Sequence, residues 1–252
     1  MDALRAHIKG MIRRLCLLAL VAAAAASPAA SPPAGAAGRP ERVPDEDHAQ
    51  WRAIGRVNVV GFRSGGSCTG TLIAPDRVLT AAHCLFALDD HRPAKPDQVH
   101  FVAGWLKGRY AAHSTAVEIR IHPGYRHGKS PDSKSLKNDV AVLRLAGRLP
   151  RASVPPLPVN PVADTGGPLS IIGYRRDRPN ALTRDADCRA LVQNGGVLGL
   201  DCEVTFGTSG APVLAETGDG WAVVGVVSAG NTGPGPVKTI AAPVGAAFAY
   251  GP

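Results

Sequence analysis

Short apolar runs separated by turn-forming residues recur along the chain from about residue 51 onward. Several alternate between apolar and polar residues or are rich in β-branched side chains, which is typical of strands. The strongest are residues 56–60, 99–103, 116–121, 169–174 and 221–227. Glycine and proline, at 29 and 22 of the 252 residues, favour many short strands over long helices. The pattern predicts an all-β protein with one short helix near residues 243–250.

The size of the chain suits one folded domain. A chain of 252 residues that is 45% hydrophobic and 19% charged can bury a substantial core, and all-β folds of this size are often single domains. A proline-rich stretch, residues 149–161, divides the chain into two halves. Spacing alone predicts an all-β protein with a central hinge at this stretch.

The first 44 residues have the composition of a targeting segment and a leader. Four basic residues between positions 5 and 14 precede an apolar stretch, residues 15–26, that is too short to span a bilayer. We interpret residues 1–26 as a secretory signal peptide and residues 27–44 as a disordered leader or short propeptide. The folded domain then spans residues 45–252. We expect the protein to be secreted or periplasmic, without a stable membrane anchor.

The charge balance does not indicate a polyanionic partner. The formal net charge is +8; without residues 1–26, 24 basic and 19 acidic residues remain, a net charge of +5. Residues 175–178 form a basic cluster that could contact an acidic substrate or a cell-wall polymer, although most such clusters are solvated loops. Aromatic residues do not alternate with basic ones as they do in nucleic-acid grooves, so we expect no nucleic-acid partner.

Four cysteines remain when Cys16 leaves with the signal peptide. An even number suits the oxidising compartment that a secreted protein enters. Four cysteines allow three pairings, and their spacing does not choose among them. The chain has no Cys-x-x-Cys motif, so we expect no metal site.

Three side chains could together make an activated nucleophile. His83 lies in the apolar segment 79–84, Asp139 opens an apolar run, and Ser209 lies between Gly207 and Gly210. A serine hydroxyl needs a neutral imidazole to take its proton, and a buried carboxylate on the other ring nitrogen fixes the tautomer. The N–H groups of Gly207 and Ser209 could then stabilise an oxyanion. Each residue alone is more often a core histidine, a turn aspartate or a tight turn; the combination predicts catalysis.

The same residues carry a resemblance to a known family. Residues 80–84, 138–143 and 207–212 resemble, in the same order, the His, Asp and Ser blocks of the chymotrypsin/trypsin-like serine peptidases. The resemblance runs from about Trp51 onward, and the compact bacterial branch, which includes the glutamyl-endopeptidase-like enzymes, is the most similar. Further similar segments are residues 67–73, 121–125 and 226–230.

This resemblance implies a fold and a reaction. The fold would be two six-stranded antiparallel β-barrels, about residues 51–150 and 163–250, with the active site in the cleft between them. The reaction would be hydrolysis of peptide bonds by a secreted serine endopeptidase. It would use a triad of His83, Asp139 and Ser209, an acyl-enzyme intermediate, and an oxyanion hole made by the N–H groups of Gly207 and Ser209.

The resemblance also assigns the cysteines and a substrate-binding strand. It pairs Cys68 with Cys84 and Cys188 with Cys202. The strand segment Ser228, Ala229 and Gly230 would bind the main chain of the substrate. We expect a protein or peptide substrate, no cofactor and no metal, and a monomer.

Several positions depart from the family pattern. Thr208 stands where trypsin-like enzymes have Asp, and Cys202 lies only seven residues before Ser209, so the loop at the base of the specificity pocket is shortened. Glu203 could be an acidic pocket residue, but the shortened loop breaks its register. The histidine of glutamyl-specific relatives has no counterpart at Val226. The residue preference therefore stays open, as do two alternative functions: a secreted esterase with the same triad, and an inactive homologue that acts as a binding module.

Overall fold

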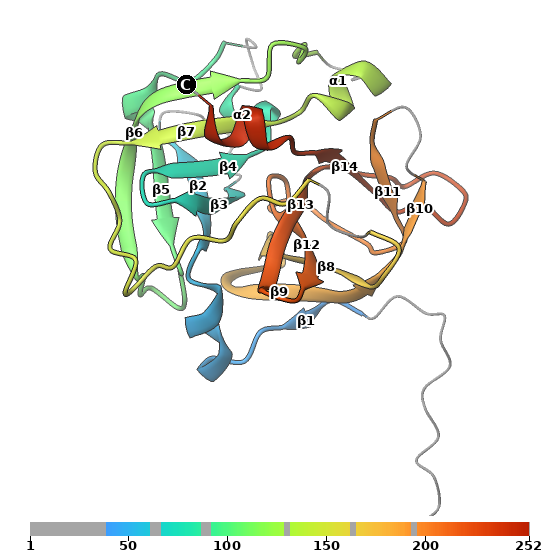
Figure 1. Ribbon diagram of the computed structural model, residues 1–252, viewed down its shortest axis with the longest axis horizontal. Helices are drawn as coiled ribbons and strands as arrows, with labels where there is room; N and C mark the ends of the chain where they lie inside the picture. Colours follow the sequence, from blue (N-terminus) through green and yellow to red (C-terminus); the bar gives the residue numbers. More distant parts are fainter. Residues whose placement is uncertain are drawn as a thin grey trace, which may run out of the picture. The chain divides into compact units, whose positions relative to one another are not determined.

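The computed structural model describes residues 39–60, 67–86, 92–128, 132–161, 165–192 and 196–251 (Figure 1). The predicted signal peptide and residues 27–38 of the predicted leader lie outside these ranges. The strands are β1 (Glu41–Arg42), β2 (Ile54–Val59), β3 (Cys68–Ala74), β4 (Arg77–Thr80), β5 (Val99–Ala103), β6 (Ala112–Ile121), β7 (Ala141–Leu145), β8 (Leu169–Arg175), β9 (Arg178–Cys188), β10 (Ala190–Val192), β11 (Leu198–Leu200), β12 (Pro212–Thr217), β13 (Gly220–Gly230) and β14 (Thr239–Pro243). The helices are α1 (Ser133–Lys137) and α2 (Ala246–Tyr250), with 3₁₀ turns η1 (Glu46–Trp51), η2 (Ala82–Leu85) and η3 (Pro96–Gln98).

The first half of the chain forms a closed antiparallel barrel. Its strands are hydrogen-bonded in the order β2-β3-β4-β7-β6-β5, and β5 returns to β2. The alternation that predicted β5 appears as Val99, Phe101 and Ala103 buried, with the residues between them half-buried. Neighbouring strands contribute Leu72, Leu143 and other apolar residues to the same core. Period-2 patterning therefore produces this barrel, because one face of each strand points inward.

The second half supplies seven strands that, together with β1 from the start of the described chain, form an eight-stranded antiparallel sheet in the order β1-β9-β8-β12-β13-β14-β11-β10. The predicted all-β class is confirmed. The prediction of six strands for this half is wrong, because the short strands β1 and β10 extend the two edges. Strand β8 is buried except at its last residue, and β13 is buried from Ala222 to Ser228, which explains why these segments are mostly apolar and do not alternate.

The end of the predicted leader belongs to this sheet. Glu41 and Arg42 pair with Arg184 and Thr183 of β9, and the N–H of Val43 donates to Leu182 O over 2.9 Å. Val43 is buried. For residues 27–44 the sequence predicts a disordered leader or short propeptide; the pairing of residues 41–43 with β9 excludes disorder for these three and does not bear on the propeptide alternative. Composition did not show that β9 is long enough to offer a pairing edge, or that Val43 has an apolar site to fill.

The proline-rich stretch between the halves is fixed to both sheets. Leu157 N–H donates to Leu72 O over 3.0 Å in the first barrel, and Val223 N–H in the second sheet donates to Pro158 O over 2.8 Å. Val154 is fully buried. Main-chain hydrogen bonds on both sides therefore hold the segment that the spacing predicted as a hinge.

Helix α2 lies across the first barrel (Figure 1). Arg77 donates to Tyr250 O and Gly251 O over 2.6 and 2.7 Å, and Arg120 donates to Gly251 O over 2.8 Å. Basic side chains suit the carbonyl end of a helix, where the acceptors have no partner within the helix. Within the described residues, none of the helices has the length and apolar character needed to cross a membrane.

Candidate active site

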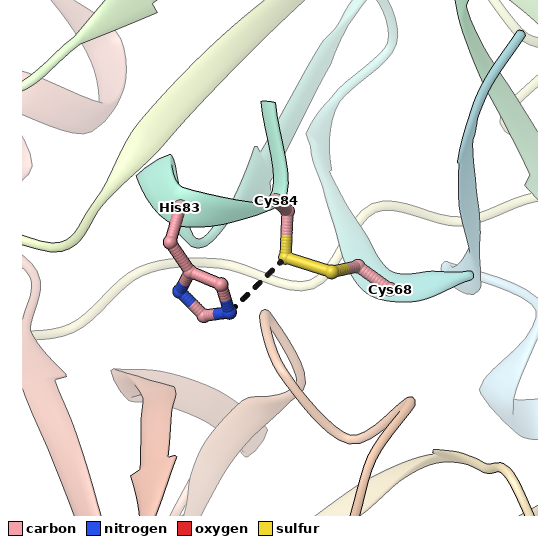
Figure 2. Close-up of side chains that lie close together, drawn as sticks. All are labelled: Cys68, His83 and Cys84. Atoms are coloured by element: carbon pink, nitrogen blue, oxygen red, sulfur yellow. Dashed lines mark hydrogen bonds between the residues drawn. A yellow bond between two sulfur atoms is a disulfide. The ribbon is translucent and has the colours of Figure 1, made fainter. Parts of the chain in front are cut away.

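His83 is held in η2, directly after strand β4 of the first barrel. The next residue, Cys84, forms a disulfide with Cys68 at the start of β3 (Figure 2). The His83 Nε2 atom lies 3.8 Å from Cys84 Sγ. A disulfide sulfur carries no proton and cannot donate to the ring, so this contact leaves Nε2 able to accept a proton from another group.

Asp139 lies between α1 and β7, and only 3% of its surface is exposed. Its Oδ1 accepts the main-chain N–H of His83 over 2.8 Å, and its Oδ2 contacts His83 Nδ1 over 2.6 Å. Oδ2 also accepts the hydroxyl of Ser228, from β13, over 2.5 Å. Three hydrogen bonds offset the cost of burying this carboxylate. Two of them hold one histidine, across 56 positions of sequence.

The carboxylate decides both the tautomer and the basicity of His83. With Nδ1–H donated to Asp139, the neutral ring keeps its lone pair on Nε2. Burial lowers the pKa of His83, but the charge and the hydrogen bond of Asp139 outweigh it, so the pKa lies above the usual 6.5. The imidazole is therefore a stronger base than a free one, with its accepting nitrogen away from the carboxylate.

Ser209 lies in a tight turn that two glycines make possible. Gly207 and Gly210 have φ values of +93° and +80°, which side chains with a Cβ rarely adopt. A Cβ on Gly210 would lie 2.2 Å from Thr69 O, so this position also requires glycine for space. The turn is attached to both halves: Thr69 N–H donates to Ser209 O, and Gly210 N–H donates to Val227 O, each over 2.8 Å.

The Gly207 N–H is oriented by contacts of the peptide group that contains it. Phe206 O accepts the N–H of Arg176 over 2.7 Å. In a planar trans peptide the N–H points opposite to the carbonyl, so this bond directs the Gly207 N–H away from Arg176. The Gly207 carbonyl accepts the Thr69 hydroxyl over 2.9 Å, which fixes the next peptide group. Within the described part of the chain, the Gly207 N–H donates no hydrogen bond.

The direction of the Ser209 N–H is determined in the same way, by the peptide group that contains it. Thr208 O accepts the N–H of Ala211 over 2.9 Å, so the Ser209 N–H on the other side of that peptide is directed away from Ala211. It too donates no hydrogen bond to any described residue. Two N–H groups in the turn around the Ser209 hydroxyl are therefore free to bind an oxygen that gains charge.

His83 and Ser209 line one cavity of about 380 Å³. Its walls come from residues 204–206, before the Ser209 turn, and residues 227–230 of β13, with Thr232 beyond them. A second cavity of about 220 Å³ lies against His83 and Asp139 and is lined by Tyr125, Leu136 and Ser228, among others. Within the described residues no hydrogen bond joins Ser209 to His83. Catalytic hydrogen bonds often tighten only when substrate binds.

The structure places the residues predicted from sequence as follows. His83, Ser209, Ser228, Ala229 and Gly230 share the larger cavity, and Asp139 contacts His83 from behind. The cysteines form the pairs Cys68–Cys84 and Cys188–Cys202. Glu203 is exposed and does not line the cavity, so the structure does not support its alternative assignment as an acidic pocket residue.

Sequence reasoning missed three contributors. Thr69 is fully buried, and its hydroxyl bridges Gly207 O and Tyr174 N–H. Arg176 orients the Phe206 carbonyl by its main chain. Ser228 was assigned to substrate binding and not to the support of Asp139. A threonine beside a cysteine, or a main-chain N–H in a β-turn, carries no local signal that could have identified these roles.

A second buried carboxylate lies outside the site. Asp185 of β9 is 3% exposed, and neither carboxylate oxygen has a hydrogen-bond partner among the described residues. Burial raises its pKa to about 7; Arg175 opposes this shift, while the charges of Asp201 and Glu203 add to it. The neighbouring Cys188 and Cys202 are joined in a disulfide and so have no thiolate to offer a metal ion.

Comparisons with known proteins agree with this geometry. The sequence model of the trypsin-like peptidase domain matches residues 68–226, which is more than half of the chain. The chain therefore belongs to the trypsin-like peptidase family. Among curated proteins it is 34% identical to the vitellin-degrading protease of Bombyx mori over 105 residues, 41% of this chain and 34% of that protein. It is 38% identical to coagulation factor XII of Rattus norvegicus over 81 residues, 32% of this chain and 12% of that protein.

The chain thus spans about a third and about an eighth of these two relatives. Solved structures share the fold over a larger part. A Glu endopeptidase in complex with MPD matches 85% of this chain and 94% of its own, with a TM-score of 0.66 and 21% identity. The protease Anisep from Arthrobacter nicotinovorans matches 82% of this chain and 92% of its own, with a TM-score of 0.60 and 19% identity. The fold is therefore the chymotrypsin-like one, in agreement with the family that the sequence model assigns.

Proposed function

We propose that the protein is a secreted serine endopeptidase with His83, Asp139 and Ser209 as its catalytic triad. The observation that carries the proposal is the pair of hydrogen bonds between Asp139 and His83. One carboxylate accepts both the main-chain N–H and the ring Nδ1–H of this histidine. The same histidine shares a cavity with Ser209, whose turn leaves two N–H groups free.

In the proposed reaction the Ser209 hydroxyl attacks the carbonyl carbon of the scissile peptide bond. Its proton passes to His83 Nε2, and the resulting imidazolium is stabilised by Asp139. The carbonyl oxygen becomes an oxyanion between the N–H groups of Gly207 and Ser209. His83 then gives its proton to the leaving amine as the C–N bond breaks. Water attacks the acyl-enzyme by the same route and releases the acid and free Ser209.

A strand edge that no described strand pairs with favours a peptide substrate over a simple ester. Strand β12 begins at Pro212, opposite Val226 of β13, so it does not extend alongside Ser228, Ala229 or Gly230. An extended peptide can add to such an edge through main-chain hydrogen bonds. The edge leads directly into the cavity that contains Ser209. An esterase that acts on simple esters needs no such edge, and an inactive binding homologue needs no nucleophile beside it.

Labelling of the nucleophile tests the proposal. A fluorophosphonate probe should modify the protein at Ser209, found by peptide mapping, and should not modify a Ser209→Ala variant of the same thermal stability. Casein or a mixed peptide library should be cleaved by the first protein alone. Absence of labelling in the folded protein would contradict the triad, and labelling with ester but no peptide hydrolysis would favour the esterase.

Secretion forms part of the proposal. The two disulfides support an oxidising compartment, and the basic and apolar first 26 residues support export. N-terminal sequencing of the protein recovered outside the cytoplasm should begin near residue 27. An intact N-terminus on cytoplasmic protein with free thiols would contradict export.

A further inference from the structure

Among the described residues, no Asp, Glu, Lys or Arg side chain lines the larger cavity beside Ser209. Val204, Thr205 and Phe206 form one wall, and Val227, Ala229 and Gly230 contribute to the other. Apart from His83, none of the lining residues is titratable. Two nearby charged residues do not line the cavity: Glu203 is exposed, and the Arg176 guanidinium lies 4.6 Å from the centre of the Phe206 ring.

The two walls approach closely where Val204 faces Gly230. A methyl group built on Gly230 would lie 3.4 Å from Val204 O and 3.5 Å from Val204 Cγ2. These are ordinary contact distances, so the gap at this level accepts about one methyl group. A flat aromatic ring between two walls needs about 7 Å, because carbon atoms on each face approach to about 3.5 Å. Val204 therefore limits how deep a side chain can enter.

The lining of the cavity also disfavours charged substrate side chains. A carboxylate, ammonium or guanidinium group that enters the cavity loses water and meets, among the described residues, only hydroxyl groups and the His83 imidazole, which is neutral when it acts as the base. The lost hydration is therefore poorly compensated. The Ser228 hydroxyl that lines the cavity is already donated to Asp139. Short aliphatic side chains lose nothing by leaving water and gain contact with Val204, Phe206 and Ala229.

This inference rests on the proposed function: we propose that the cavity binds the side chain of the substrate residue on the acyl side of the cleaved bond. It selects small uncharged aliphatic residues, alanine and valine above all, and Val204 is the residue that determines this preference. A preference for glutamate, as the name of one structural neighbour states for that protein, is not expected here. Valine occupies positions 226 and 227 on the β13 side, and no Lys or Arg side chain among the described residues lines the cavity.

The test is a series of otherwise identical peptide anilides that carry Ala, Val, Leu, Phe, Glu, Lys or Arg at the acyl-side position. Enzyme concentration is fixed by titration with the fluorophosphonate probe. We expect kcat/KM for Ala and Val to exceed the values for Glu, Lys and Arg by at least about 100-fold, and the value for Phe by about tenfold. The highest kcat/KM for a charged residue or for Phe would overturn the inference.

A variant tests the role of Val204. Val204→Ala removes two methyl groups and should raise the Phe-to-Ala ratio of kcat/KM by about tenfold. The matched control is Val117→Ala, an exposed position on β6 of the first barrel, which should leave the ratio unchanged. An unchanged ratio in Val204→Ala that labels fully would overturn the role of Val204. If that variant does not fold, the substrate series on the wild-type protein still decides the preference.

Failure of the proposed function would look different from failure of this inference. A folded protein that neither reacts with the probe nor cleaves any peptide contradicts the triad. A protein that reacts at Ser209 and cleaves after charged or aromatic residues keeps the triad and refutes the small aliphatic pocket.

Discussion

Replacement of Asp139 by Asn tests the mechanism through the tautomer of one histidine. The Asp139→Asn side chain must place its NH₂ group where either Oδ1 or Oδ2 now lies. Oδ1 accepts the main-chain N–H of His83, a donor that cannot change. Oδ2 accepts the ring Nδ1–H and the Ser228 hydroxyl, and both of these can reverse by tautomer exchange or rotation. The NH₂ group will therefore occupy the Oδ2 position.

The consequence is a histidine with its proton on the wrong nitrogen. Nδ1 must accept from the new NH₂ group, so the neutral ring carries its proton on Nε2 and cannot take one from Ser209. In established Ser–His–Asp peptidases, loss of the correct tautomer lowers kcat by about 10⁴, which corresponds to about 5 kcal/mol of barrier. We expect a loss of this size, with the fold intact.

Titrated enzyme and an alanine or valine anilide give kcat and kcat/KM across pH. Ser228→Ala is the matched control, because it removes a hydrogen bond to the same oxygen without changing the tautomer, and it should lose less than about tenfold. The acidic limb of the pH–rate profile, where His83 becomes protonated, supplies a second readout. Without the carboxylate, burial alone acts on His83, so its pKa should fall below 6.5. Activity of Asp139→Asn within tenfold of the wild type would refute this reasoning, as would an equal loss in Ser228→Ala.

Three further outcomes follow from the same structure. In the wild type, kcat/KM should rise with pH as His83 loses its proton, with a midpoint above 6.5, because Asp139 raises the pKa of His83. A midpoint below 6 would contradict the proposed pairing of His83 with Asp139. The pKa of Asp185 is raised to about 7, so the folded protein keeps a proton that the unfolded chain releases above about pH 4. The free energy of unfolding should therefore fall as the pH rises from 4 to 7, by up to about 4 kcal/mol. Denaturant titration should find Asp185→Asn without this loss; identical pH dependence in both proteins would refute it. Replacing Cys188 and Cys202 together by Ala should lower the free energy of unfolding by about 3 kcal/mol, the chain-entropy value for a loop of this size, and an unchanged denaturation midpoint would count against that estimate.

The sequence by itself determined the class of fold and the short catalytic segments. The runs that predicted strands at residues 99–103 and 169–174 coincide with β5 and β8, because side-chain alternation and continuous apolar character are local properties of a chain. The sequence also identified the three candidate catalytic segments for the same reason: residues 80–84, 138–143 and 207–212. Each segment carries its own chemistry and needs no neighbour to be noticed.

Only the tertiary structure decided how these segments meet. Strand register and barrel closure bring Asp139 to His83, orient the Gly207 N–H through Arg176, and place Val204 against Gly230. The same is true of the pairing of β1 with β9, which composition assigned to a disordered leader. Such contacts join residues far apart in the chain, and their free energy depends on which strand edges and cavities face each other. No local pattern encodes that arrangement, because it exists only once the strands of both halves have paired.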